Sequence, residues 1–249
     1  MTDRPPERIE ADPPRILRLL SRGEVAIEGL IPWSSNTTML VTVTDEELSA
    51  LAVYKPQRGE RPLWDFDLGT LGAREVASYL LSEALGWGLV PPTVLRDGPY
   101  GIGSVQLFIH ARDDAHFFTI QLDPAYADGL RRLAAFDAVA NNADRKSGHC
   151  LIDHAGQLWA IDNALTFHEH PKLRTVIWDF AGEPLPADLV ADLRRLERML
   201  REGGEVNGAL THLLTRAELD AMRRRLRHLL TAGCFPDPGP GRHVPWPLV

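Results

Sequence analysis

The stretch that decides the fold is NADRKSGHCLIDHAGQLWAIDN, from Asn142 to Asn163. Its first eight residues are polar and predict a loop, which contains Asp144 and Lys146. The next twelve predict a short hairpin, with apolar runs at 150–153 and 157–161, and Asp162 follows it directly. Phosphoryl transfer needs a metal held by hard oxygens and a carboxylate near the acceptor hydroxyl. Asp162 and Asp144 are therefore candidates for these two tasks.

Upstream of this stretch the hydrophobic pattern changes between period 2 and period 3.6. A short helix is predicted at 15–22, and a second, amphipathic helix at 72–85. Strands are predicted at 24–31, 38–44, 48–55, 90–95 and 103–109. Residues 56–71 are rich in Gly, Pro and charge and are expected to form a loop.

Downstream the pattern is mainly helical. Helices are expected at 128–141, 187–201 and 216–231, with irregular chain at 162–186. The sequence therefore predicts an α+β protein with two lobes. Residues 1–14 form a flexible tail, 15–109 a small β-rich N-lobe, 110–235 a mostly helical C-lobe and 236–249 a Pro-rich tail.

Composition excludes several classes of protein. The chain has 249 residues, a net charge of −7 and 44% hydrophobic residues, which is globular composition. The acidic balance disfavours a nucleic-acid partner. Two cysteines, Cys150 and Cys234, cannot form a disulfide scaffold, so a reducing, cytoplasmic location is expected. No uninterrupted apolar run is long enough to span a membrane, and no membrane anchor is evident.

Five stretches, in order, resemble the phosphatidylinositol 3-/4-kinase superfamily, in particular its type II 4-kinase branch and bacterial relatives. They are Val53-Tyr54-Lys55-Pro56, Arg74-Glu75-Val76-Ala77 with the strand that follows, Gly103–Ile109, Asn142-Ala143-Asp144-Arg145 and Ala160–Phe167. They span about residues 24–170. Each stretch is weak alone, and the order makes the signal specific. The resemblance implies a bilobal protein-kinase-like fold.

The resemblance also implies roles for individual residues. Lys55 would contact the ATP phosphates and pair with Glu75, and Asp144 would orient the acceptor. Asp162 would hold Mg²⁺ or Mn²⁺, and Lys146 would neutralise the transferred phosphate. The remaining ATP contacts would come from the hinge, Gln106, Leu107, Phe108 and Ile109, and from a phosphate-covering turn, Ser34, Ser35, Asn36 and Thr37.

This sequence departs from the family pattern at two positions. His149 stands where the family has an Asn that binds the second metal, which implies a weaker ligand, a preference for Mn²⁺ or one lost metal site. Ala164 replaces a glycine. Glu75 lies nearly opposite the apolar stripe of its helix, so it can serve only if both faces of the helix are covered, and Glu83 is the alternative.

The leading hypothesis is an ATP-dependent kinase acting on a hydroxyl of a soluble metabolite, inositol- or polyol-like, or of a protein Ser or Thr. A pseudokinase that binds nucleotide or a partner protein without turnover is the main alternative, because of His149 and Ala164. A protein nucleotidyltransferase and a non-kinase scaffold are the others. The sequence does not indicate an oligomeric state.

Overall fold

The structure is a computed structural model that describes residues 12–32, 36–201 and 203–249. The chain divides into two compact units. Unit 1 contains the described residues up to Gly72 together with Pro91–Ala111, and unit 2 contains Ala73–Val90 and Arg112–Val249.

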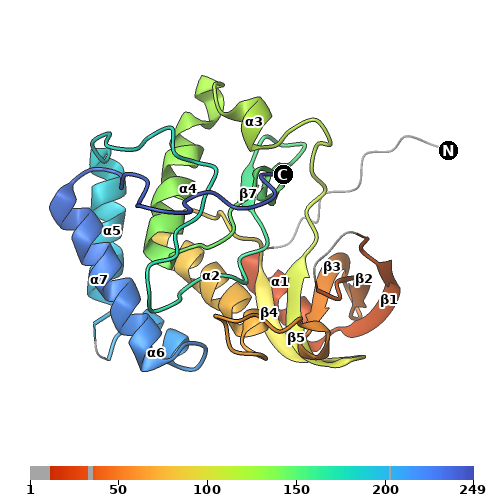
Figure 1. Cartoon of the computed structure of the whole chain (residues 1–249). Coiled ribbons are helices and arrows are strands. Elements are labelled where there is room, and N and C mark those ends of the chain that lie inside the picture. The colour runs from red at the N-terminus through yellow and green to blue at the C-terminus, as the bar shows by residue number, and fades with distance from the viewer. Residues whose placement is uncertain (1–11, 33–35, 202) are drawn as a thin grey trace. The chain divides into compact units, whose positions relative to one another are not determined.

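Unit 1 is built on a five-stranded antiparallel sheet (Figure 1). The strand order is β1-β2-β3-β5-β4, so the last two strands add as a hairpin beside β3. The strands are β1 (Glu24–Leu30), β2 (Met39–Thr44), β3 (Ser49–Pro56), β4 (Thr93–Gly98) and β5 (Gly101–Leu107). Alternating residues of β2 and β3 are buried, as the period of 2 predicts. β1, β2 and β3 pair in chain order and form the expected antiparallel meander.

One helix packs against the sheet and completes the hydrophobic core of unit 1. Helix α1 (Pro13–Arg22) begins two residues before the predicted start at Arg15, because the Asp12 carboxylate caps it by accepting from the Arg15 N–H. Its buried face, Ile16, Leu19 and Leu20, packs in one hydrophobic cluster with residues of β2, β3 and β5. This cluster holds the sheet that carries Lys55 at the end of β3.

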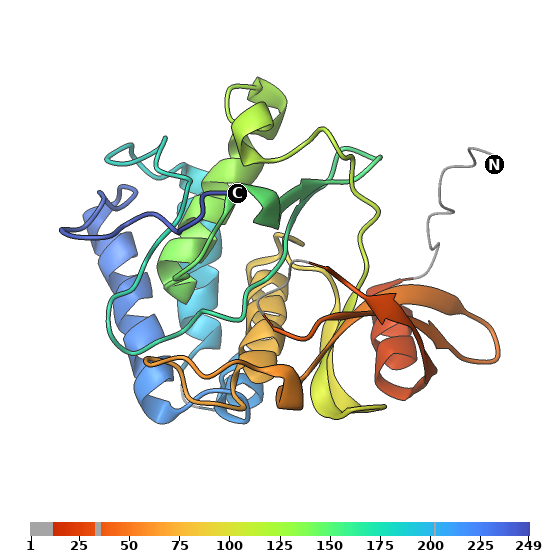
Figure 2. The same ribbon diagram turned by 45° about the vertical axis from the view of Figure 1, so that its right-hand side comes forward.

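Unit 2 is mainly helical. Helices α4 (Ala127–Ala140), α5 (Ala187–Met199) and α7 (Arg216–Ala232) form its body, and α7 packs against both of the others (Figures 1 and 2). The remaining elements are α2 (Leu71–Leu85), the short helices α3 (Phe117–Ile120) and α6 (Glu205–Thr211), the 3₁₀ turns η2 (Pro124–Tyr126) and η3 (Ser147–His149), and the hairpin β6 (Cys150–Ile152) and β7 (Leu158–Ala160). A 3₁₀ turn at Gln57–Gly59, η1, belongs to unit 1.

The structure confirms the α+β class and nearly all of the predicted elements, and it adds the short helices α3 and α6. Helix α6 was not expected, because Asn207 and Gly208 are poor helix formers. The sequence boundary at residue 109 assigns the whole second helix to the N-lobe, whereas Ala73 onward groups with unit 2. The segment after α7 has no helix or strand, as expected, and it is bonded to unit 2 through the Phe235 and His243 carbonyls.

The described part of the chain contains no helix with the length and apolar character that a membrane span requires.

Candidate active site

The polar loop of unit 2 begins where α4 ends. Asn141 takes a left-handed conformation, with φ of 56°, and stops the helix. Its side-chain amide donates to the His168 and His170 carbonyls at 2.9 and 2.7 Å, and its oxygen accepts from the Lys172 N–H at 2.8 Å. The next residue, Asn142, donates to Asp137 at 3.0 Å and accepts from the Asp144 N–H at 2.9 Å. These bonds fix the backbone of the loop at Asp144.

Asp144 and Lys146 face each other on this loop. The Lys146 Nζ lies 3.2 Å from the Asp144 Oδ2, and both side chains are about one quarter exposed. Burial raises the pKa of Asp144 above its usual value, Lys146 and Arg242 oppose this, and Asp162 adds to it. Asp144 is therefore a partly desolvated carboxylate with a cation beside it, a suitable group for accepting a hydroxyl hydrogen bond.

Asp162 lies where β7 ends and has a left-handed backbone with φ of 56°. Its carboxylate is 46% exposed, and its Oδ2 lies 3.4 Å from the Nε2 of His149. The other ring nitrogen of His149, Nδ1, accepts from the Lys146 N–H at 3.4 Å. The structure thus brings together Asp144, Lys146, His149 and Asp162, which the sequence predicted as one site.

A buried guanidinium joins the loop to the segment after β7. Arg145 is fully buried and donates from Nε and Nη2 to the carboxylate of Asp137, which is equally buried, at 3.0 to 3.2 Å. Its Nη1 donates to the Ile161 carbonyl at 2.9 Å, and its Nη2 donates to the Asn163 side-chain oxygen at 2.5 Å. Burial disfavours the charge of Arg145, but Asp137 outweighs burial and the pKa of the guanidinium is raised. The residues on either side of Asp162 are therefore tied to the loop of Asp144.

Glu75 is 2% exposed and lies in unit 2, where its Oε2 accepts from the Asn163 N–H at 3.0 Å. Its neighbour Arg74 donates to the Thr166 carbonyl at 2.6 Å and also bonds to the Glu218 carboxylate. The helical wheel predicted that Glu75 can serve only if both faces of its helix are covered. Both faces of α2 are covered, so this condition is met. The alternative, Glu83, is exposed. Glu75 is the better candidate, and its pairing with Lys55 stays a prediction.

The predicted ATP-binding residues of unit 1 occupy defined positions. Lys55 is half-buried in β3 opposite Ser104 of β5. Gln106 is buried and donates to the Thr93 hydroxyl at 2.8 Å. The N–H groups of Leu107 and Phe108 donate to the Pro92 and Leu51 carbonyls, and the adenine contacts of Leu107, Phe108 and Ile109 stay a prediction.

Two of the four predicted phosphate-covering residues, Ser34 and Ser35, lie outside the described residues. The other two are bonded to the segment after β3. Asn36 accepts from the Arg61 N–H at 2.9 Å, and the Thr37 N–H donates to the Gly59 carbonyl at 3.1 Å. Their role toward phosphate stays a prediction.

The donor set at Asp162 fits a nucleotide-bound metal better than a metal held by protein alone. Among the described residues, no three His, Cys, Asp or Glu side chains form a metal cage. Mg²⁺ and Mn²⁺ in such enzymes are usually held by one or two carboxylates together with phosphate oxygens and water. One carboxylate with one imidazole nitrogen suits Mn²⁺, which accepts nitrogen more readily than Mg²⁺ does.

Sequence reasoning missed Asp137 and Asn163, which complete the Arg145 network. Asp137 had a detectable signal, because it lies four residues after Leu133 and seven after Leu130, on the buried stripe of α4. A carboxylate on an apolar stripe needs a buried partner. Asn163 lies within one of the five family-like stretches, but its four bonded atoms could not be foreseen.

Comparisons with known proteins bear on the fold and the family of the chain. No family model matches the sequence. The crystal structure of the Golgi casein kinase with Mn/ADP bound superposes with a TM-score of 0.59 and 14% identity, covering 88% of this chain and 75% of that one. The structure of hydra Fam20 with sugar gives a TM-score of 0.57 with 16% identity, covering 90% and 89%. The Helicobacter pylori proinflammatory kinase CtkA gives 0.52 with 12% identity, covering 87% and 94%.

These likenesses confirm the predicted protein-kinase-like fold. None of the three is described as a phosphatidylinositol kinase, so that finer assignment stays a prediction. Protein Rv2133c of Mycobacterium tuberculosis is 39% identical over 262 residues, covering 92% of this chain and 94% of that protein. The chain therefore belongs to the same family as Protein Rv2133c and has a protein-kinase-like fold.

Proposed function

We propose that the chain is an ATP-dependent phosphotransferase that moves the γ-phosphoryl group of ATP to a hydroxyl of a soluble metabolite or of a protein Ser or Thr. One observation carries the proposal most directly. The Asp144 loop and the segment of Asp162 are joined by a buried guanidinium in a kinase-like fold. One structural neighbour adds support, since that Golgi casein kinase has Mn and ADP bound.

Asp144 would accept a hydrogen bond from the acceptor hydroxyl and take its proton as the new bond to phosphorus forms. Lys146, 3.2 Å away, favours the ionised form of this carboxylate and so opposes the effect of its partial burial. The Lys146 ammonium group would also stabilise the negative charge on the phosphoryl oxygens. Positioning and charge neutralisation are the main sources of rate in phosphoryl transfer.

Asp162 and His149 would hold the divalent metal, which when bound neutralises phosphate charge. Arg145 and Glu75 do not touch the reacting atoms and act by position, because they fix the backbone of Ile161 and Asn163 on either side of Asp162. Lys55 is the candidate contact of unit 1 with the nucleotide phosphates.

The test is a mass balance of the nucleotide. The purified chain is incubated with ATP and Mg²⁺ or Mn²⁺, and binding, ADP formation and protein mass are followed. We expect metal-dependent ATP binding and slow formation of ADP. Turnover should be lost in Asp144→Asn and in Asp162→Asn. Asp113→Asn, which removes the same charge from an exposed site, should behave as wild type.

The outcomes separate the alternatives. Binding with unchanged ATP would favour the pseudokinase, which His149 motivates, and AMP added to a protein would favour nucleotidyl transfer. A folded chain that binds no ATP would overturn the kinase proposal.

A further inference from the structure

The last part of the chain is held against the Asp144 loop. We call residues 235–249 the C-terminal segment. The His243 carbonyl accepts from the Thr175 N–H at 3.1 Å and from the Trp178 indole at 3.0 Å. The Leu248 carbonyl accepts from the Ser147 N–H at 2.8 Å, so the segment is bonded within three residues of Asp144. Figures 1 and 2 both show it leaving α7 and crossing unit 2.

This placement brings a cation toward Asp144. The charge of Arg242 is one of the influences on the Asp144 carboxylate, and both residues belong to unit 2. Arg242 is exposed, and its Nε donates to the Val244 carbonyl at 3.2 Å. It forms no ion pair with any residue in the described ranges. Its guanidinium keeps donors for a ligand in solution.

A second arginine, Arg174, has its backbone bonded to the Asp144 loop. Arg145 and Thr175 form a parallel bridge, and both side chains reach Asp137. Asp144 and Arg174 are the residues that directly precede the two bridged residues. The Arg174 N–H donates to the Asn142 carbonyl at 2.8 Å, and its carbonyl accepts from Arg145 at 3.0 Å, which fixes its backbone beside the loop.

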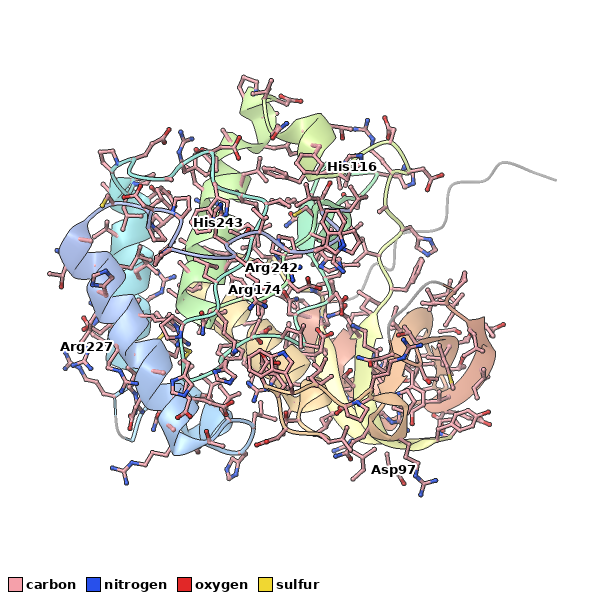
Figure 3. All side chains as sticks on the ribbon, in the orientation of Figure 1. Asp97, His116, Arg174, Arg227, Arg242 and His243 are labelled. Atoms are coloured by element: carbon pink, nitrogen blue, oxygen red, sulfur yellow. The ribbon has the colours of Figure 1, made fainter. Side chains whose placement is uncertain are left out.

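One donor of the Arg174 side chain is unused. Its Nε is buried and has no hydrogen-bond partner among the residues that the structure describes. A buried donor without an acceptor is uncommon in proteins, and a bound anion would supply the missing acceptor. Figure 3 labels Arg174 and Arg242 on the same side of unit 2, whereas Arg227 lies on the outer side of α7.

We propose that Arg174 and Arg242 bind the anionic group of a phosphate-bearing acceptor, whose free hydroxyl then lies at Asp144. The inference rests on the proposed function and narrows its acceptor to a phosphate ester. The planar guanidinium fork matches phosphate oxygens in pairs, and two arginines with Lys146 nearby supply enough positive charge for a dianion. The C-terminal segment is thereby part of the acceptor site.

The test uses the full chain and inorganic phosphate as the probe. Nitrogen–proton correlation spectra of the arginine Nε–H groups are recorded at pH 6.5 during a phosphate titration. Arg174→Gln and Arg242→Gln assign the two signals by their loss. We expect both signals to shift in the wild type, and each variant to weaken phosphate binding about tenfold. Arg227→Gln, an exposed residue of the same charge, should leave the dissociation constant unchanged.

Phosphate that leaves these two signals unmoved, or that binds all variants equally, would overturn the proposal. ATP affinity, measured on the same samples, separates the two inferences. Loss of ATP binding in the arginine variants would assign the arginines to the nucleotide and also overturn the proposal. Phosphate binding at both arginines in a chain that binds no ATP would leave the anion site standing and refute the kinase function.

The phosphate ester could be free in solution or the headgroup of a lipid. Glycerol 3-phosphate and phosphatidylinositol in phosphatidylcholine vesicles are therefore compared as competitors of inorganic phosphate. Competition by either at the two arginine signals supports the anion site and identifies the source.

Discussion

Asp137→Asn is the sharpest test of the network that holds the two halves of the candidate site together. Asp137 and Arg145 are both fully buried and share bonds of 3.0 to 3.2 Å. Asparagine keeps one acceptor oxygen and nearly the same shape but removes the charge. Arg145 then stays buried as a cation without a counterion.

Breaking a buried ion pair on one side costs about 3–5 kcal/mol, and the retained oxygen places this change near the lower end. A loss of about 3 kcal/mol corresponds to a fall of about 6–12 °C in the Tm of a protein of this size. The free energy of unfolding is measured by urea denaturation and Tm by circular dichroism, with an unchanged m-value as the sign that the unfolded state is the same.

Arg132→Gln is the matched control. Its pair with Asp188 has a similar length, 3.2 Å, but the two side chains are 38% and 66% exposed. Exposed pairs contribute at most about 1 kcal/mol, so this variant should differ little from wild type. If Asp137→Asn loses less than about 1 kcal/mol, Arg145 is not a buried cation that depends on Asp137, and the account of the site is wrong.

Three further predictions concern protonation and metal. Because burial raises the pKa of Asp144 and Lys146 opposes this, turnover should fall as pH drops through that raised value, and Lys146→Met should move the fall to higher pH, measured as a pH–rate profile. His149→Asn exchanges a nitrogen ligand for oxygen and should lower the ratio of Mn²⁺- to Mg²⁺-supported turnover severalfold; an unchanged ratio would mean that His149 does not bind the metal. Burial raises the pKa of Cys150 to about 12, so iodoacetamide at pH 8 should label Cys234 first, as read by peptide mass spectrometry, and equal labelling would contradict the buried position.

The helices and strands of this structure could be predicted because each type of element has its own hydrophobic periodicity. The strands of unit 1 and the helices α2, α4, α5 and α7 follow from alternation and from the 3.6-residue repeat. Asp144 and Asp162 were identified as candidates by their places after a helix and after a hairpin, which are local features.

The contacts that organise the site could not be predicted, because they join residues distant in sequence. Asn163 meets Glu75 across 88 positions. The helical wheel alone made Glu75 appear solvated, since a wheel does not show that a second layer covers the polar face. The C-terminal segment has no periodicity, and its docking depends on carbonyls and one indole rather than on an apolar stripe.

Asn163 has a consequence for inhibitor design. Its N–H, carbonyl, side-chain amide and side-chain oxygen each have a protein partner, in Glu75, Thr166, Ala160 and Arg145. A compound that turned this residue outward would break four hydrogen bonds, at about 0.5–1.5 kcal/mol each. Its affinity would fall by a factor of about 30 to 20,000. Compounds that bind without displacing Asn163 should therefore be the main hits of a screen against this protein.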